Sequence, residues 1–132
     1  MVLVDSNVLI DLFTGDPEWA DWSTDRFIEQ AAKDTLCLNP IIYAEISIAF
    51  TTVKKLETAL EPLQILRREL PFEAAFIAGK AFLDYKRAGG EKRSPLPDFY
   101  IGAHAACSQF PLLTRDAKRY RTYFPGIQLI SP

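Results

Sequence analysis

The chain has 132 residues, of which 48% are hydrophobic and 24% charged. This length and composition are ordinary for one globular domain with a sizeable core. The formal net charge of −2 gives no bulk indication of nucleic-acid binding. No signal-peptide pattern and no uninterrupted membrane span are found, and Cys37 and Cys107 lie in apolar segments without metal-ligand spacing. We therefore expect a cytoplasmic protein with reduced cysteines and no membrane contact.

The first half of the chain alternates short apolar segments with helical patterns. A buried strand is predicted over residues 1–4, followed by a short helix over residues 8–13 that stops at Gly15. Asp16-Pro17 is typical of a helix start, and a helix is expected from residue 17 to residue 33. A second strand is expected over residues 35–38. Asn39-Pro40 then predicts a helix that runs to about residue 51.

The second half continues the alternation. Helices are predicted over residues 53–70 and 72–88, and the second is closed by Gly89-Gly90. After a basic loop over residues 90–97, a helix is expected to about residue 108. A strand over residues 112–114, a helix over 117–123 and a strand over 127–130 complete the chain. Short apolar strands separated by helices predict an α/β fold with a parallel sheet covered on both faces.

Four carboxylates stand at the ends or inside of apolar segments, at Asp5, Glu45, Asp98 and Asp116. In open parallel sheets, functional residues gather at the carboxyl ends of the strands, and Asp5 and Asp116 each follow a predicted strand. Asp5, Asp98 and Asp116 also have a simpler interpretation, because each can cap a helix or favour its positive end. A fold that joins all four acids would form a pocket of negative charge suited to a divalent metal.

Glu45 differs from the other three acids because it lies in the body of a predicted helix. Ile41, Ile42, Ile48 and Ala49 are three or four positions away from it, so they share its face. Burial of an unpaired carboxylate costs several kcal/mol. Glu45 therefore requires either a buried lysine or arginine partner or a metal ion.

Oxygen donors without a cysteine or a suitable histidine favour the hard cations Mg²⁺ or Mn²⁺. The single histidine, His104, lies about 120° from Asp98 around the predicted helix, so we interpret it as structural. A zinc site built from histidines is excluded for lack of ligands. A metal held by carboxylates can supply a hydroxide nucleophile and neutralise charge on a phosphodiester.

Four segments resemble the motifs of PIN-domain ribonucleases, in order and over nearly the whole chain. They are residues 4–11 with Asp5, residues 43–45 with Glu45, residues 96–105 with Asp98, and residues 113–116 with Asp116, followed by Tyr120 and Phe124. A one-domain chain of this size most resembles the VapC toxins of toxin–antitoxin pairs. The resemblance implies one domain over residues 1–132, folded as a three-layer sandwich with a short central parallel sheet flanked by helices.

The same resemblance implies an activity, partners and site residues. The activity is that of a Mg²⁺-dependent endoribonuclease on structured RNA, often tRNA, and the partners are a VapB-type antitoxin and a second copy of the chain. Asp5, Glu45, Asp98 and Asp116 are the implied metal ligands and catalytic residues. Polar neighbours at Ser6, Asn7 and Thr114 match positions that support the site.

Basic and apolar residues suggest further contacts. Arg115 adjoins the acidic site in sequence, and Lys92 and Arg93 precede Asp98, so these three are candidates for RNA phosphate. Apolar stripes over residues 17–33 and 53–70 predict either core packing or the surface for a second copy and an antitoxin segment. Their members are Trp19, Trp22, Phe27, Leu56, Leu60, Leu63 and Leu66.

Three other functions were weighed. A receiver-like signalling domain needs an acidic pair after its first strand and an aspartate after a middle strand, but Asp5 stands alone and Asn39 follows the second strand. A phosphatase with an aspartyl nucleophile would carry a second acid where Asn7 stands. A PIN fold that binds RNA or acts as a scaffold without cleaving remains the main alternative.

Overall fold

In the computed structural model of residues 1–132, five parallel strands form one sheet in the order β3-β2-β1-β4-β5. The strands are β1 (Val2–Val4), β2 (Leu36–Leu38), β3 (Leu66–Arg67), β4 (Leu112–Leu113) and β5 (Leu129–Ile130). The three inner strands are buried along their whole length, which explains why they read as continuous apolar segments.

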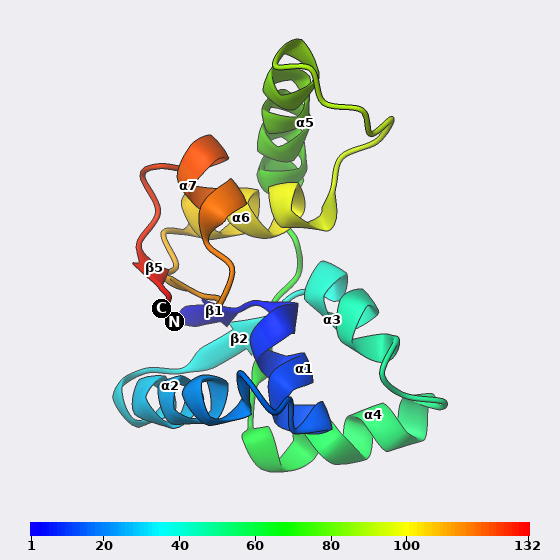
Figure 1. Cartoon of the computed structure of the whole chain (residues 1–132), viewed down its shortest axis with the longest axis vertical. Helices are drawn as coiled ribbons and strands as arrows, with labels where there is room; N and C mark the ends of the chain where they lie inside the picture. Colours follow the sequence, from blue (N-terminus) through cyan, green and yellow to red (C-terminus); the bar gives the residue numbers. More distant parts are fainter.

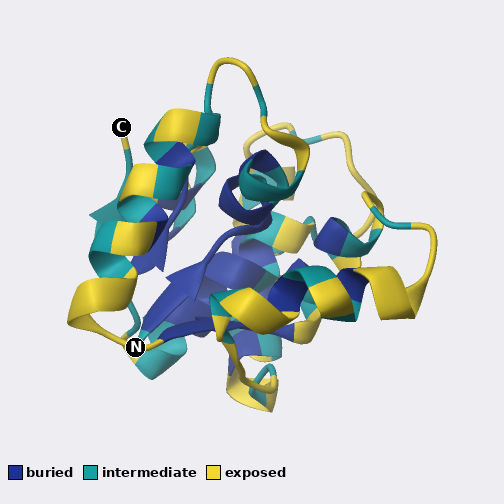
Figure 2. Ribbon diagram, turned by 90° about the horizontal axis from the view of Figure 1, so that it is seen from below, coloured by how far each residue is buried: buried dark blue, intermediate teal, exposed yellow.

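Helices cover both faces of the sheet. They are α1 (Ser6–Thr14), α2 (Ala20–Lys33), α3 (Pro40–Ser47), α4 (Val53–Leu60), α5 (Phe72–Arg87), α6 (Pro97–Ser108) and α7 (Lys118–Tyr123). In Figure 1, α1, α2 and α4 lie below the strands, whereas α5, α6 and α7 lie above them. Figure 2 shows the buried sheet between helices whose outer faces are exposed. These layers confirm the predicted three-layer α/β fold.

The strand order places one crevice at the centre of the sheet. β1 pairs with β2 on one side and with β4 on the other, so the chain order reverses between β1 and β4. Open α/β sheets bind their ligands at the carboxyl ends of the strands next to such a reversal. Receiver-like domains have the order 2-1-3-4-5, so the observed order excludes that alternative.

Cap residues at helix starts hold the carboxyl edge of the sheet in place. Asp5 Oδ1 accepts a hydrogen bond from Ser6 N at 2.8 Å where β1 turns into α1. Asn39 Oδ1 accepts one from Ile42 N at 2.9 Å where β2 turns into α3. Pro97 occupies the first turn of α6, where no backbone N–H is needed. The helices α1, α3 and α6, which are capped by Asp5 or contain Glu45 and Asp98, therefore lie at the carboxyl edge of the sheet.

The helix predicted over residues 53–70 is wrong in its second half. α4 ends at Leu60, a short 3₁₀ turn follows over Glu61–Leu63, and β3 then adds an edge strand to the sheet. Pro62 lacks the N–H that a continuing helix requires, and Gln64 adopts a left-handed conformation at φ 52°. Leu56, Leu60 and Leu63 keep a helical spacing, so their pattern does not indicate that the helix ends at Leu60.

Two other helix boundaries differ from the predictions. Asp16 Oδ1 accepts hydrogen bonds from the N–H groups of Glu18 and Trp19, so its capping role is real, but residues 17–19 form a turn and α2 begins at Ala20. α3 ends at Ser47 and not near residue 51. Ile48 is consequently 88% exposed, and the apolar face predicted around Glu45 is only partly buried.

Most of the apolar stripes predicted on α2 and α4 belong to the core. Phe27, Leu56 and Leu60 are buried, and Trp22 and Leu63 pack partly buried against them. Leu66 is 43% exposed and Trp19 is only partly buried, so the use of these stripes as a surface for a second copy or an antitoxin stays a prediction. None of the seven helices is long and apolar enough to cross a membrane.

Candidate active site

Asp5 lies at the centre of the crevice between β1 and β4. Its backbone N–H donates to Leu113 O at 2.9 Å, and its side chain is buried at 2% exposure. Oδ2 accepts hydrogen bonds from Thr114 Oγ1 and Tyr120 Oη, both at 2.9 Å. The carboxylate is thus held by groups from β1, the end of β4 and α7.

Glu45 reaches Asp5 through a serine hydroxyl. Ser6 Oγ donates to Glu45 Oε1 at 2.9 Å and lies 3.4 Å from Asp5 Oδ1. Glu45 is half-buried and has no lysine or arginine partner, so the ion pair considered for it is not formed. Burial is the main cause that raises its pKa, and the charge of Asp98 raises it further.

Asp98 reaches Asp5 through a tyrosine hydroxyl. Tyr120 Oη lies 2.9 Å from Asp5 Oδ2 and 3.2 Å from Asp98 Oδ1, and one hydroxyl proton cannot be donated to both at once. Arg119 Nη1 donates to the other Asp98 oxygen at 3.3 Å. Asp98 therefore has one neutral and one charged partner, both from α7.

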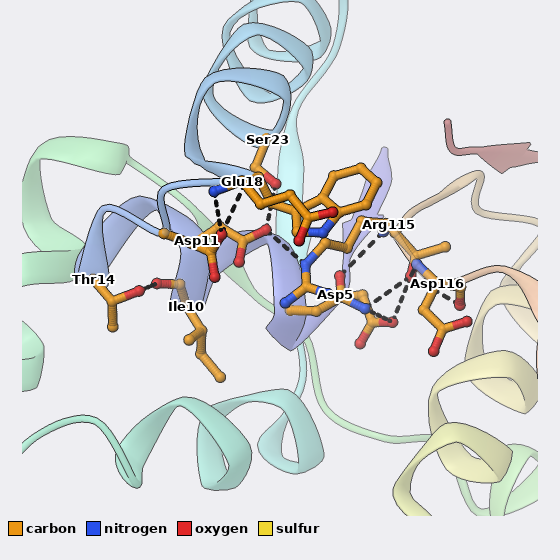
Figure 3. A network of polar contacts seen from close by, with 12 residues as sticks. Asp5, Ile10, Asp11, Thr14, Glu18, Ser23, Arg115 and Asp116 are labelled. Carbon is orange, nitrogen blue, oxygen red and sulfur yellow. Dashed lines mark hydrogen bonds and ion pairs between the residues drawn. The ribbon is translucent and has the colours of Figure 1, made fainter.

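Asp116 stands at the rim. Its side chain is exposed, and its backbone N–H donates to Thr114 Oγ1 at 3.2 Å. Asn7 Nδ2 donates to the same Thr114 oxygen at 3.2 Å, and Asn7 Oδ1 accepts from Arg115 N at 3.2 Å. Asn7 and Thr114 thus fasten the loop that carries Asp116 to the start of α1, and Figure 3 shows Asp116 beside Asp5.

The buried carboxylate carries the electrostatic signature of the site. The pKa of Asp5 is raised from 3.8 to about 6, chiefly by burial and also by the charges of Asp98 and Glu45, while the hydrogen bonds from Tyr120 and Thr114 lower it. Burial also raises the pKa of Tyr120 well above its ordinary value. Three carboxylates are therefore electrically coupled around Asp5, and Asp116 adds a fourth at the edge.

The acidic side chains fit a divalent cation in their chemistry. Neither lysine nor arginine neutralises Asp5, and the candidate metal ligands are carboxylate oxygens, which Mg²⁺ and Mn²⁺ prefer. As the side chains stand, however, no three acidic, thiol or imidazole groups lie close enough to share one ion. Metal binding at this edge would therefore require the carboxylates to draw together.

Arg115 has a structural partner on the other side of α1. Its Nε donates at 2.8 Å to Asp11 Oδ2, which also accepts from Ser23 Oγ at 2.7 Å, and Asp11 is 1% exposed. The Arg115 guanidinium also lies 5.6 Å from the Trp19 ring centroid. Figure 3 shows this network beside Asp5. These contacts orient Arg115 toward Asp11, which weakens its case as a phosphate contact.

The remaining predicted residues lie away from the buried carboxylates. Lys92 and Arg93 are exposed in the loop between α5 and α6, which Figure 1 shows extending away from the sheet, and they stay candidates for RNA contact. His104 is buried, and its Nδ1 lies 3.0 Å from Asn39 Nδ2. Burial lowers the pKa of His104, as expected for a neutral structural imidazole.

Tyr120 and Arg119 were not singled out from the sequence as site residues. Both belong to the short helix that begins two residues after Asp116. The place of Tyr120 beside the fourth motif of the PIN-domain resemblance is the signal that could have placed it near the acids. The contacts themselves depend on how α7 packs on α6, which no local pattern reveals.

Comparison with known proteins assigns the fold to a recognised class of α/β domain. The sequence matches the PIN domain over residues 2–125, and the chain therefore belongs to the PIN-domain family. PIN domains are typically nucleases and generally use divalent metal ions. A search of curated protein sequences found no match.

Several solved structures share the fold. VapBC2 from Rickettsia felis, bound to a promoter DNA fragment, matches with a TM-score of 0.76 at 16% identity, over 100% of this chain and 99% of the other. VapBC-1 from nontypeable Haemophilus influenzae matches at 0.73 and 20%, and DNA-bound VapBC from Salmonella typhimurium at 0.72 and 20%; each covers 99% of this chain and 98% of the other. At such identities the likeness demonstrates a shared fold.

Proposed function

We propose that the chain is a divalent-metal-dependent endoribonuclease and the toxin of a VapBC-type toxin–antitoxin pair. One observation carries the proposal: a buried carboxylate, Asp5, is coupled to Glu45 and Asp98 at the central crevice of a PIN fold, without a cationic partner. A buried charge that costs stability and has no structural partner is typical of a functional site.

In this proposal Asp5, Glu45, Asp98 and Asp116 hold Mg²⁺ or Mn²⁺. The bound ion would supply a hydroxide nucleophile and neutralise charge on the phosphodiester. The chain's own polar groups fix the acids: Ser6 holds Glu45 beside Asp5, and Thr114 holds the Asp5 carboxylate. Asn7 Nδ2 donates to Thr114 Oγ1, and the same oxygen accepts from the backbone N–H of Asp116 and so keeps Asp116 in place.

The proposed partners follow from the structural neighbours. The similar structures from Rickettsia felis and Salmonella typhimurium are VapBC complexes on DNA. By analogy we propose a VapB-type antitoxin for this chain, a homodimeric assembly, and structured RNA such as tRNA as substrate in the cytoplasm. The exposed apolar residues of α5 are our candidate surface for the second copy of the chain.

The metal requirement tests the nuclease proposal. Purified chain should cleave RNA with Mg²⁺ or Mn²⁺ and lose that activity in EDTA, measured by gel electrophoresis of a labelled tRNA. Asp5→Asn should lower the cleavage rate by at least about 100-fold, because it removes the central charge while it keeps the shape.

Asp25→Asn is the matched control, because Asp25 is exposed on α2 and makes no ion pair. It should cleave at the wild-type rate. Cleavage by the Asp5→Asn protein at the wild-type rate, or undiminished cleavage in EDTA, would show that the activity does not arise from this site.

The second candidate is a PIN-fold protein that binds RNA without cleaving it. The observation in its favour is that the carboxylates do not form a closed ion site as they stand. This candidate predicts RNA binding with no cleavage at any divalent metal concentration. It also predicts that Asp5→Asn leaves RNA affinity unchanged or improves it, because a negative charge is removed.

A further inference from the structure

A cavity of about 330 Å³ opens directly beside the acidic edge, between α6 and α7. We propose that it binds one unpaired nucleotide of the RNA substrate next to the cleaved phosphate. The residues that carry the argument are Tyr85, Asp98, Asp116, Lys118, Arg119 and Tyr123. The proposal rests on the proposed nuclease function, since Asp98 and Asp116 belong to both the cavity and the acidic site. The volume lies at the lower end of the range of about 300–1,000 Å³ typical of small-ligand pockets.

Two cations face the cavity with donors to spare. Lys118 is exposed and forms no ion pair. Arg119 uses Nη1 for Asp98 at 3.3 Å, and its side chain is 41% exposed, so its other guanidinium donors remain available. A planar guanidinium binds phosphate oxygens in pairs, and a lysine beside it adds charge. Both cations line the cavity and can contact phosphate groups of a bound nucleotide.

Two aromatic rings also line the cavity. The rings of Tyr85 and Tyr123 lie 6.4 Å apart between centroids, and both pack against the fully buried ring of Phe99, at 5.6 and 5.1 Å. Each tyrosine is half-buried, and neither hydroxyl has a protein partner among the hydrogen bonds of the chain. Tyrosine rings held in place beside a cavity can contact a nucleobase, and Tyr123 is the less enclosed of the two because Phe82 and Gly90 also pack against Tyr85.

The combination of rings and cations selects an unpaired nucleotide. Inside a duplex the faces of a base are covered by its neighbours, so a stacking wall recognises bases that are splayed out of a helix. Asp98 and Asp116 repel phosphate on their own, but a divalent ion at the acidic edge would offset the charge of these two carboxylates. Occupation of the cavity should therefore depend on metal at the neighbouring site.

Binding rather than cleavage tests the cavity. Fluorescence anisotropy would compare a labelled RNA decamer without self-complementarity with the duplex of the same strand, both with Ca²⁺ in place of Mg²⁺. Arg119→Ala and Lys118→Ala should each weaken single-strand binding about tenfold, as expected for a lost hydrogen bond between charged groups. Each should also reduce the slope of log affinity against log salt by about 0.7.

Arg121→Ala is the matched control on the same helix. Arg121 Nη2 contacts Ser131 Oγ and does not line the cavity, so this variant should bind within about twofold of wild type. Tyr123→Leu should weaken binding of the single strand and leave the duplex unchanged. Thermal melting checks that each variant is folded, and the exposed position of Lys118 makes Lys118→Ala safe if Arg119→Ala is unstable.

The outcomes separate the cavity from the nuclease. Equal losses for Arg119→Ala and Arg121→Ala, or wild-type affinity of both cavity cation variants, would overturn the cavity proposal even if the wild-type chain cleaves RNA. If the cavity variants lose RNA affinity as expected but the wild-type chain never cleaves RNA, the cavity proposal stands and the nuclease proposal is refuted.

Discussion

Asp5 carries two local roles with opposite energetic signs. As the cap of α1 it stabilises the helix by about 1 kcal/mol. As a buried group beside Glu45 and Asp98 it has a pKa raised from 3.8 to about 6, a shift that corresponds to about 3 kcal/mol against the ionised form. The unfavourable effect is larger, so capping alone does not explain an aspartate here. A cation that binds the ionised form would recover this energy.

The pH dependence of stability should show the buried charge directly. Because the folded pKa of Asp5 lies above the unfolded value, the folded state holds a proton between pH 4 and pH 6 that the unfolded state has released. Metal-free protein should therefore lose stability as the pH rises through that window. Urea unfolding in EDTA at pH 5 and pH 7 measures the difference.

Asp5→Asn provides the comparison for that measurement. The variant should lose less stability than wild type between pH 5 and pH 7, and at pH 7 it should be more stable than wild type without metal, by up to about 3 kcal/mol. A pH profile identical in both proteins would mean that Asp5 is ionised without cost, and would remove the electrostatic basis of the site.

The sequence predicted the acids better than their surroundings. Asp5 follows a strand and Glu45 interrupts an apolar helix, so each is visible in a short window, and the structure does bring both together with Asp98. The ion pair of Arg115 with Asp11 joins residues 104 positions apart. Such contacts depend on tertiary packing, so the sequence did not indicate this ion pair, and a phosphate contact by Arg115 stays a prediction.

At the scale of elements, α6 is placed by close approach of its backbone to an aromatic side chain. The contact is between Gly102 of α6 and Phe124, which lies just after α7. A Cβ atom on Gly102 would lie 2.3 Å from the Phe124 ring. Because α6 carries Asp98 and α7 carries Tyr120, this contact also sets the distance between two site residues.

Gly102→Ala should therefore destabilise the protein by about 1–3 kcal/mol through overpacking of the buried Phe124 ring. Gly79→Ala is the matched control, because Gly79 lies inside α5 with no atom near its added Cβ. The control should gain about 0.5–1 kcal/mol from helix propensity. Denaturant unfolding compares the two, and a neutral Gly102→Ala would show that Phe124 moves aside freely.

The elements that prediction located least well are those set by neighbours in the sheet. β3 has two exposed residues, and it exists because Cys37 and Leu38 of β2 offer a pairing edge to Leu66 and Arg67. Its sequence alone has no strand signature, and the preceding leucines continue a helical spacing. By contrast β1, β2 and β4 are buried on both faces and were found from their apolar residues alone.

At the scale of the whole molecule, three of the seven exposed large apolar residues lie on α5. Phe72 is 95% exposed and Phe76 67%, and Leu83 continues the same side of the helix. The buried side of α5 is lined by alanines that pack toward α6. A helix with large apolar residues on its solvent side is typical of a protein–protein contact.

The proposed homodimer should therefore depend on α5. Phe76→Glu places a charge among exposed apolar side chains, and in a two-fold interface the change acts twice. Burial of one phenylalanine contributes about 1.5–3 kcal/mol, so the dimer dissociation constant should rise about a hundredfold or more. Size-exclusion chromatography with light scattering over a concentration series measures the change.

Ile28→Glu, at a residue 62% exposed on α2, is the matched control and should stay dimeric. A wild-type chain that is monomeric at high concentration would refute the dimer, and equal dissociation of both variants would move the interface away from α5.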